Sequence, residues 1–140
     1  MADILIVDDD EVIRDTLKEL LSEHYVCKTA GTADDAFARL AEKPYDLVLT
    51  DISMPGISGL ELLGRVLELY PKMPVIVVSG ISDQEHVQGL IKLGAFDFLL
   101  KPFRLEVVEK SVRRGLEYRR RLIEARDETT EDGGWKIVDQ

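Results

Sequence analysis

The 140-residue sequence has one cysteine, fewer basic than acidic residues and no long apolar run. The single Cys27 cannot form a disulfide within the chain, which excludes a disulfide-stabilised fold. No stretch approaches the roughly 18 continuous apolar residues that span a bilayer. The first residues, MADILIVDDD, have neither the basic start nor the long apolar segment of a secretory signal. We therefore expect a cytoplasmic protein that makes no membrane contact.

Basic charge is scarce overall and is concentrated in one segment. The net charge of −9 lacks the positive footprint that nucleic-acid phosphates require, so we expect no direct nucleic-acid binding. Residues 1–103 hold 18 acidic and 9 basic residues, residues 104–126 hold 4 and 8, and residues 127–140 hold 5 and 1. We predict one domain over residues 1–126, which ends in a long basic helix over about 104–126. Residues 127–140 are expected to be an acidic tail or linker without stable structure.

Four short apolar runs and one alternating segment predict five strands. The runs are too short for buried helices and consist mostly of β-branched residues and leucine, which is typical of strands buried on both faces of a parallel sheet. The alternating segment is typical of an edge strand. The five segments are ILIV (4–7), YVCKTA (25–30), LVL (47–49), VIVV (75–78) and FLL (98–100).

The segments between these strands have a helical period. Apolar residues recur every three or four positions, as in Ile13, Leu17 and Leu20. Five repetitions of strand then helix predict a parallel sheet with right-handed crossovers and helices on both faces. In such α/β folds the functional groups collect outside the carboxyl ends of the strands.

Polar side chains follow four of the predicted strands. They are Asp8 to Asp10, Asp51, Ser79 and Lys101, and we expect them to meet at one edge of the sheet. Neighbouring carboxylates stay ionised together only when a cation offsets their repulsion. Oxygen ligands that leave room for water suit Mg²⁺, and a lysine can hold a phosphoryl oxygen. These groups together indicate phosphoryl transfer, in which an aspartate can be the nucleophile.

The segments ILIVDDD, LVLTDISMPGISGLELL, VIVVSG and FLLKPF have an order and spacing that resembles the receiver (REC) domains of two-component response regulators. The resemblance covers about residues 3–118. It implies a flavodoxin-like, doubly wound (βα)5 fold, which is a three-layer α/β sandwich. Its five-stranded parallel sheet would have the order 2-1-3-4-5.

The same resemblance implies a metal site and a phosphoacceptor. Asp51 would accept the phosphoryl group. Asp9 would bind Mg²⁺ (or Mn²⁺) directly and Asp8 largely through water, and Asp51 and the backbone carbonyl of Ser53 would complete the protein ligands.

The resemblance also implies the residues that hold the phosphoryl group and transmit its arrival. Lys101 would pair with the phosphoryl group, and its bond to Pro102 would be cis. Ser79 stands at the hydroxyl switch position, where threonine is also frequent. Phe98 stands at the aromatic switch position, where tyrosine is frequent, so the partner face is expected to be more apolar.

We therefore predict a phosphoprotein of two-component signal transduction or a phosphorelay. It would be a switch that assists its own phosphotransfer and dephosphorylation, not an enzyme. Its partners would be a histidine kinase or phosphotransfer protein, an output domain or downstream protein, and a second copy through the fourth helix, fifth strand and fifth helix. The long last helix has an approximate 3,4 apolar spacing that Arg119 breaks, so it could pair with a copy of itself, continue to another domain or end as a solvated basic helix.

Two other functions fit parts of the pattern. A haloacid-dehalogenase-like phosphatase also uses an aspartate nucleophile and Mg²⁺, but it needs a second aspartate where Ser53 stands. A flavin carrier of the same fold needs a phosphate-cradling loop after the first strand, where three aspartates would repel phosphate. Among the remaining polar residues we expect Asp10 to stabilise a helix start, Cys27 to be packing filler, and His24 and His86 to be surface residues.

Overall fold

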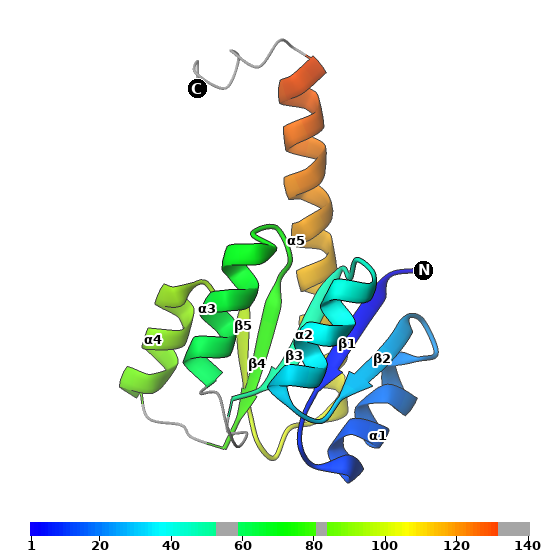
Figure 1. Cartoon of the computed structure of the whole chain (residues 1–140), viewed down its shortest axis with the longest axis vertical. Coiled ribbons are helices and arrows are strands. Elements are labelled where there is room, and N and C mark those ends of the chain that lie inside the picture. Colours follow the sequence, from blue (N-terminus) through cyan, green and yellow to red (C-terminus); the bar gives the residue numbers. More distant parts are fainter. Residues whose placement is uncertain (53–58, 81–83, 132–140) are drawn as a thin grey trace.

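The computed structural model describes residues 1–52, 59–80 and 84–131, with side chains described up to Ala125. Strands and helices alternate along these described residues (Figure 1). In chain order the elements are β1 (Asp3–Val7), α1 (Glu11–Leu21), β2 (Val26–Ala30), α2 (Ala33–Glu42), β3 (Leu47–Asp51), α3 (Gly59–Leu69), β4 (Val75–Ser79), α4 (Gln84–Leu93), β5 (Asp97–Leu100) and α5 (Leu105–Glu131).

The five strands form one parallel sheet in the order β2-β1-β3-β4-β5. The predicted flavodoxin-like order is confirmed, and the alternating segment is an edge strand as predicted. From β1 the chain adds β2 on one side and then returns to add β3 on the other side, so the strand order switches between the neighbours β1 and β3. Val7 of β1 lies opposite Thr50 of β3, so Asp8 and Asp51, the next residues along each strand, come side by side.

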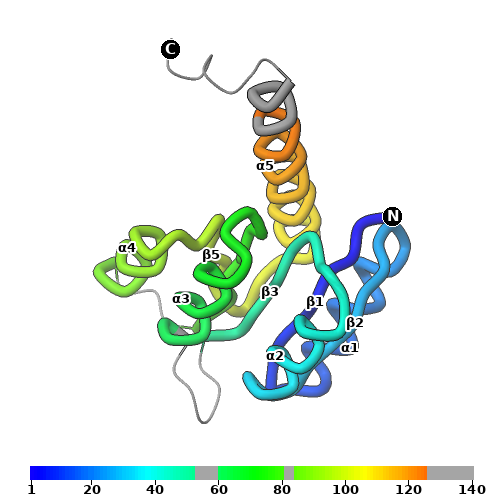
Figure 2. Tube along the Cα trace, turned by 45° about the horizontal axis from the view of Figure 1, so that its top comes forward, coloured from blue at the N-terminus to red at the C-terminus, as the bar shows by residue number. Residues whose placement is uncertain are grey.

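Helices cover both faces of the sheet (Figure 2). Successive strand residues point to opposite faces, so Leu5 and Val7 pack with α2, α3 and α4, whereas Ile4 and Ile6 pack with α1 and α5. Burial of these apolar side chains is the main stabilising contribution, and it fixes the register because a one-residue slip would exchange the two faces.

Local sequence signals set the helix ends. The Asp10 carboxylate accepts hydrogen bonds from the backbone N–H groups of Val12 and Ile13, so the predicted helix-start role of Asp10 is confirmed. Thr32 caps α2 in the same way through the N–H of Asp35. After α4, Gly94 has a φ of +115°, a conformation that glycine adopts without strain.

The last helix is longer than predicted. It spans 27 residues and includes residues 127–131, which were predicted to be tail, whereas residues 132–140 lie outside the described part. Val108 and Val112 are fully buried in the domain core, so the first part of the 3,4 spacing packs on the sheet. A Cβ at Gly115 would lie 2.8 Å from Leu47 Cδ1, so glycine allows the close approach. Past the sheet α5 projects alone (Figures 1 and 2), and no helix of the described part could cross a membrane.

Candidate functional site

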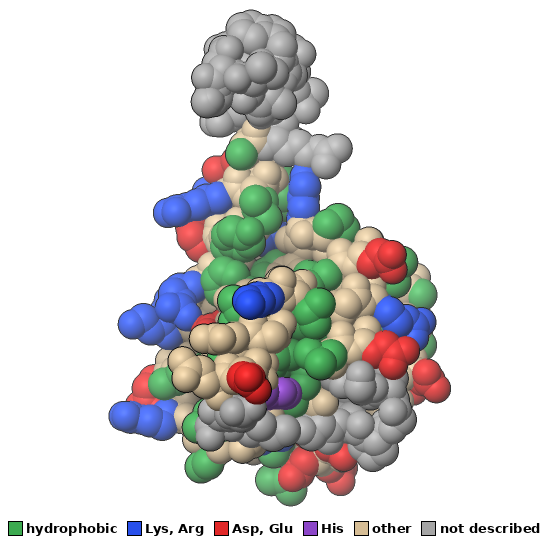
Figure 3. All heavy atoms as spheres, turned by 90° about the vertical axis from the view of Figure 1, so that its left-hand side faces the viewer, with side chains coloured by type: hydrophobic (Ala, Val, Ile, Leu, Met, Phe, Trp, Pro, Cys, Tyr) green, Lys and Arg blue, Asp and Glu red, His purple; other side chains and the backbone are tan. Residues whose placement is uncertain are grey.

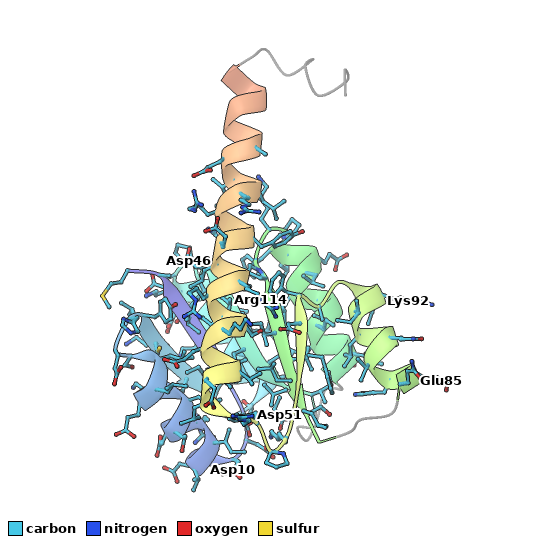
Figure 4. The ribbon with its side chains drawn as sticks, turned by 180° about the vertical axis from the view of Figure 1, so that it is seen from behind. Asp10, Asp46, Asp51, Glu85, Lys92 and Arg114 are labelled. Atoms are coloured by element: carbon cyan, nitrogen blue, oxygen red, sulfur yellow. The ribbon has the colours of Figure 1, made fainter. Side chains whose placement is uncertain are left out.

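Three carboxylates meet where β1 and β3 end. Ligand oxygens of Asp8, Asp9 and Asp51 all lie within 4.8 Å of one another. Asp8 follows β1 and Asp51 is the last residue of β3, so the pairing of these two strands brings them together. Figure 4 shows Asp51 and Asp10 at this edge of the sheet and Asp46 at the opposite edge. The predicted convergence of these aspartates is therefore present in the fold.

The site is partly closed to water, which makes its negative charge costly. Asp8 is 2% exposed and Asp51 is 4% exposed, whereas Asp9 is exposed. Burial raises the pKa of the Asp8 carboxyl, the backbone N–H of Asp10 opposes this by donating to it at 2.9 Å, and the Asp51 carboxylate raises the pKa further. A cation in contact with these oxygens would remove the repulsion.

One lysine supplies positive charge to two of the three carboxylates. Lys101 Nζ lies 3.1 Å from Asp8 Oδ2 and 3.5 Å from Asp51 Oδ1. Its backbone N–H donates to the carbonyl of Ser79 at 2.8 Å, and the Lys101–Pro102 bond is cis. Three carboxylates and one ammonium leave two negative charges, which matches a divalent cation bound through oxygen. The donor set therefore fits the metal that the sequence suggests.

The two predicted switch residues lie on neighbouring strands behind this edge. Ser79 ends β4 and is fully buried, and Phe98 of β5 is half-buried against the core. The His86 ring packs edge-on against Phe98, with centroids 6.4 Å apart and planes at 81°. Its Nε2 is buried and has no hydrogen-bond partner among the described residues. His86 is thus partly exposed, but the surface prediction missed its ring contact with Phe98, which arises because α4 packs across β5 at this point.

Ser53 and Arg14 also bear on this site. Ser53, the expected carbonyl ligand, lies outside the described residues. Arg14 was not singled out from the sequence, yet its guanidinium donates to the backbone carbonyl of Asp8 at 2.7 Å. The available signal was its spacing, because a residue four positions after the helix cap Asp10 returns to the same side of α1.

Comparison with known proteins identifies the class of this site. A family model described as the response regulator receiver domain matches residues 4–113. The DNA-binding transcriptional regulator NtrC of Salmonella typhimurium is 35% identical over 116 residues, which make up 82% of this chain and 25% of NtrC. The chain spans about a quarter of the length of such relatives.

Solved structures agree with this match. The structure of NtrX from Brucella abortus is 36% identical and has a TM-score of 0.85, and the match covers 90% of this chain and 29% of that chain. A beryllofluoride-activated DrrB receiver domain is 33% identical with a TM-score of 0.78, and the match covers 84% of this chain and 98% of that domain. The fold thus recurs in proteins that are similar along most of this sequence.

Proposed function

Because the chain belongs to the response regulator receiver family, we propose that Asp51 accepts a phosphoryl group from a phosphohistidine of a histidine kinase or phosphotransfer protein. Receiver domains, this one included, are signalling phosphoacceptors rather than enzymes. The observation that supports Asp51 most directly is its position, since it is buried at the end of β3 with Asp8, Asp9 and Lys101 around it. We place this exchange in the cytoplasm.

We assign Asp8, Asp9 and Asp51 as ligands of Mg²⁺ or Mn²⁺. The support is the shared cluster of oxygens within 4.8 Å and its net negative charge beside Lys101. The backbone carbonyl of Ser53, outside the described residues, is the remaining ligand that the family resemblance implies. When bound, the cation would neutralise the phosphoryl oxygens that gain charge during transfer.

The residues of the chain provide the nucleophile and a positive charge. An oxygen of the Asp51 carboxylate attacks phosphorus in line with the leaving histidine nitrogen. The new O–P bond forms as the N–P bond breaks, and the electron pair of the broken bond stays on the imidazole, which then takes up a proton. Lys101, whose ammonium already lies 3.5 Å from Asp51, contacts a phosphoryl oxygen.

Phosphorylation would be read through Ser79 and Phe98. The Ser79 hydroxyl turns toward the phosphoryl group, and the Phe98 ring follows into the space that this movement opens. Phe98 is half-buried and touches His86 of α4, so its movement would alter the surface of α4 and β5. The added charge at Asp51 would thereby favour one of two arrangements of Ser79 and Phe98 over the other.

We propose that the output surface is the face formed by α4, β5 and α5, and that it serves a downstream partner or a second copy of the chain. Figure 3 looks onto the α4 side, where hydrophobic side chains lie among charged ones. Exposed apolar residues from all three elements support this face: Ile91, Leu93, Leu100, Leu105 and Val107. They give a partner apolar contact area without the need for the tyrosine hydroxyl that Phe98 lacks.

We also propose that residues 1–126 form the receiver unit and that the projecting part of α5 connects it to an output domain. The support is that NtrC and NtrX are roughly four and three times as long as the matching segment. A single helix that leaves the sheet suits a connection of this kind, because its internal hydrogen bonds hold one direction along its length.

The test of Asp51 is phosphorylation by acetyl phosphate with Mg²⁺, in which the parent should gain one acid-labile acyl phosphate. Asp51→Asn should gain none, because an amide oxygen is a poor nucleophile. Asp10→Asn is the matched control, since Asp10 lies beside the site but serves as a helix cap, and asparagine caps a helix equally well. Labelling of Asp51→Asn at the parent level would overturn the proposal.

A further inference from the structure

Arg14 lies on α1, outside the carboxylate cluster, and reaches back to the strand that holds it. Its Nη1 donates to the backbone carbonyl of Asp8 at 2.7 Å, and its own backbone N–H donates to the carbonyl of Asp10 at 3.0 Å. A guanidinium that donates to a carbonyl makes a charge-assisted hydrogen bond, which is stronger than a neutral one. The first turn of α1 is therefore bonded to the loop that presents the aspartates.

This bond completes a set of contacts that hold Asp8 on every side. Its backbone N–H donates to the carbonyl of Ala30 at 3.1 Å, and its carboxylate accepts from the Asp10 N–H at 2.9 Å and from Lys101 at 3.1 Å. The Asp8 carbonyl belongs to the same planar unit as the N–H of Asp9. Holding that carbonyl therefore also sets the direction in which Asp9 leaves the strand.

Gly31 leaves the space that the guanidinium occupies. The three atoms nearest to a Cβ built at Gly31 all belong to Arg14, the closest being Nη1 at 3.0 Å and Cζ at 3.5 Å. Among the described residues the positive φ values are confined to Gly94, so the backbone of Gly31 does not itself require glycine. The fit of Arg14 explains a glycine at this position.

We propose that Arg14 is a positioning residue for the metal site: by holding the Asp8 carbonyl it keeps the Asp8 and Asp9 carboxylates aimed at Asp51. The inference rests on the proposed function, because it concerns the same cation site. Residues behind metal ligands orient those ligands, and their loss usually weakens metal affinity about 10- to 100-fold.

The direction in which Arg14→Met changes the Mg²⁺ affinity distinguishes a positioning role from a purely electrostatic one. Arg14 is a positive charge near a cation site, so its charge alone opposes Mg²⁺ binding. If charge were all that mattered, Arg14→Met would bind Mg²⁺ more tightly than the parent. If positioning dominates, the same variant binds it more weakly.

Arg39 is a matched control in the same part of the molecule. Arg14 and Arg39 line one cavity of about 460 Å³ between α1, β2 and α2. The Arg39 Nε donates to the backbone carbonyl of Thr29 at 3.3 Å, a residue outside the carboxylate cluster. Arg39→Met therefore removes the same charge and a similar bond without releasing Asp8.

The experiment measures Mg²⁺ dissociation constants by calorimetry for the parent, Arg14→Met, Arg14→Lys, Arg39→Met and Gly31→Val, with thermal unfolding as the test of folding. We expect Arg14→Met to bind about tenfold more weakly. Arg14→Lys should lie between it and the parent, because it keeps the charge but lacks the planar fork. Gly31→Val should weaken binding at least threefold, by displacing the guanidinium, and Arg39→Met should bind no more weakly than the parent.

A folded Arg14→Met protein that binds Mg²⁺ as tightly as the parent, or more tightly, would overturn the inference and leave the proposed function intact. If Arg14→Met does not fold, Gly31→Val decides, and unchanged binding there is the contrary result. A parent protein that does not bind Mg²⁺ would overturn both proposals.

Discussion

Acidic residues have different partners at the two ends of the strands, which we call the amino edge, where the strands begin, and the carboxyl edge, where they end. At the amino edge, Asp3 and Asp46 each have their own cation, since Lys43 lies 2.7 Å from Asp3 and Arg119 lies 3.2 Å from Asp46. These carboxylates are 29% and 30% exposed. At the carboxyl edge, Asp8 and Asp51 share Lys101 beside the exposed Asp9, and the side chains of Asp8 and Asp51 are only 3% and 5% exposed.

This difference distinguishes carboxylates that are individually paired from a cluster that fits a ligand site. Exposed, individually paired charges contribute little to stability, usually about 0–1 kcal/mol, and need nothing else to be satisfied. Buried carboxylates that outnumber their cations destabilise the fold, and such an arrangement persists where it binds a ligand. The carboxyl edge therefore fits a cation site, whereas the acidic residues of the amino edge are already paired.

The largest expected contrast between the two edges comes from removing their lysines. Lys101→Ala should lower the rate of phosphorylation by acetyl phosphate at least tenfold and should abolish the structural response, because the phosphoryl group loses its ammonium contact. Lys43→Ala should leave both unchanged, since Lys43 pairs with Asp3 at the other edge. The rates can be followed by intact-protein mass. Equal rates for the two variants would remove the distinction between the edges.

A smaller contrast concerns stability without metal. Asp51→Asn should stabilise the metal-free protein by about 1 kcal/mol, because it removes a buried charge next to Asp8. Asp46→Asn should destabilise it by about 1 kcal/mol, because Arg119 loses its carboxylate partner. Chemical denaturation in the presence of a chelator gives both values, and shifts of the same sign would contradict this comparison.

Added Mg²⁺ serves as the control for these two variants. Saturating Mg²⁺ should raise the midpoint of thermal unfolding of the parent and of Asp46→Asn by similar amounts, because a ligand that binds only the folded state stabilises it. Asp51→Asn should gain less, since it lacks one ligand carboxylate.

The alternation of strands and helices and the residues at the strand ends followed from local signals in the sequence, whereas the strand order came from the family resemblance. Buried parallel strands form continuous apolar runs, so β3 and β4 could be located, and Asp51 was placed at the shared edge simply because it ends such a run. The parallel order of β1 and β3 then made its contact with Asp8 a consequence of register. The individual roles of these residues came from resemblance to a family, not from the pattern.

The sequence did not reveal the contacts between side chains of one element and residues of another. The contacts of Arg14 with the Asp8 carbonyl and of His86 with Phe98 require the packing of α1 and α4 to be known. The end of α5 was placed too early because an acidic composition was interpreted as disorder, although glutamate is a good helix former. An acidic composition therefore does not by itself locate the end of a helix.

Asp51 is proposed as the residue that becomes phosphorylated. The most direct measurement is to phosphorylate the parent with acetyl phosphate and Mg²⁺, reduce the acyl phosphate with borohydride, which converts the modified aspartate to homoserine, and locate the change by peptide mass spectrometry. We predict homoserine at position 51 and at no other aspartate. A change at Asp8, at Asp9 or at an aspartate of the amino edge, with position 51 unmodified, would contradict the assignment.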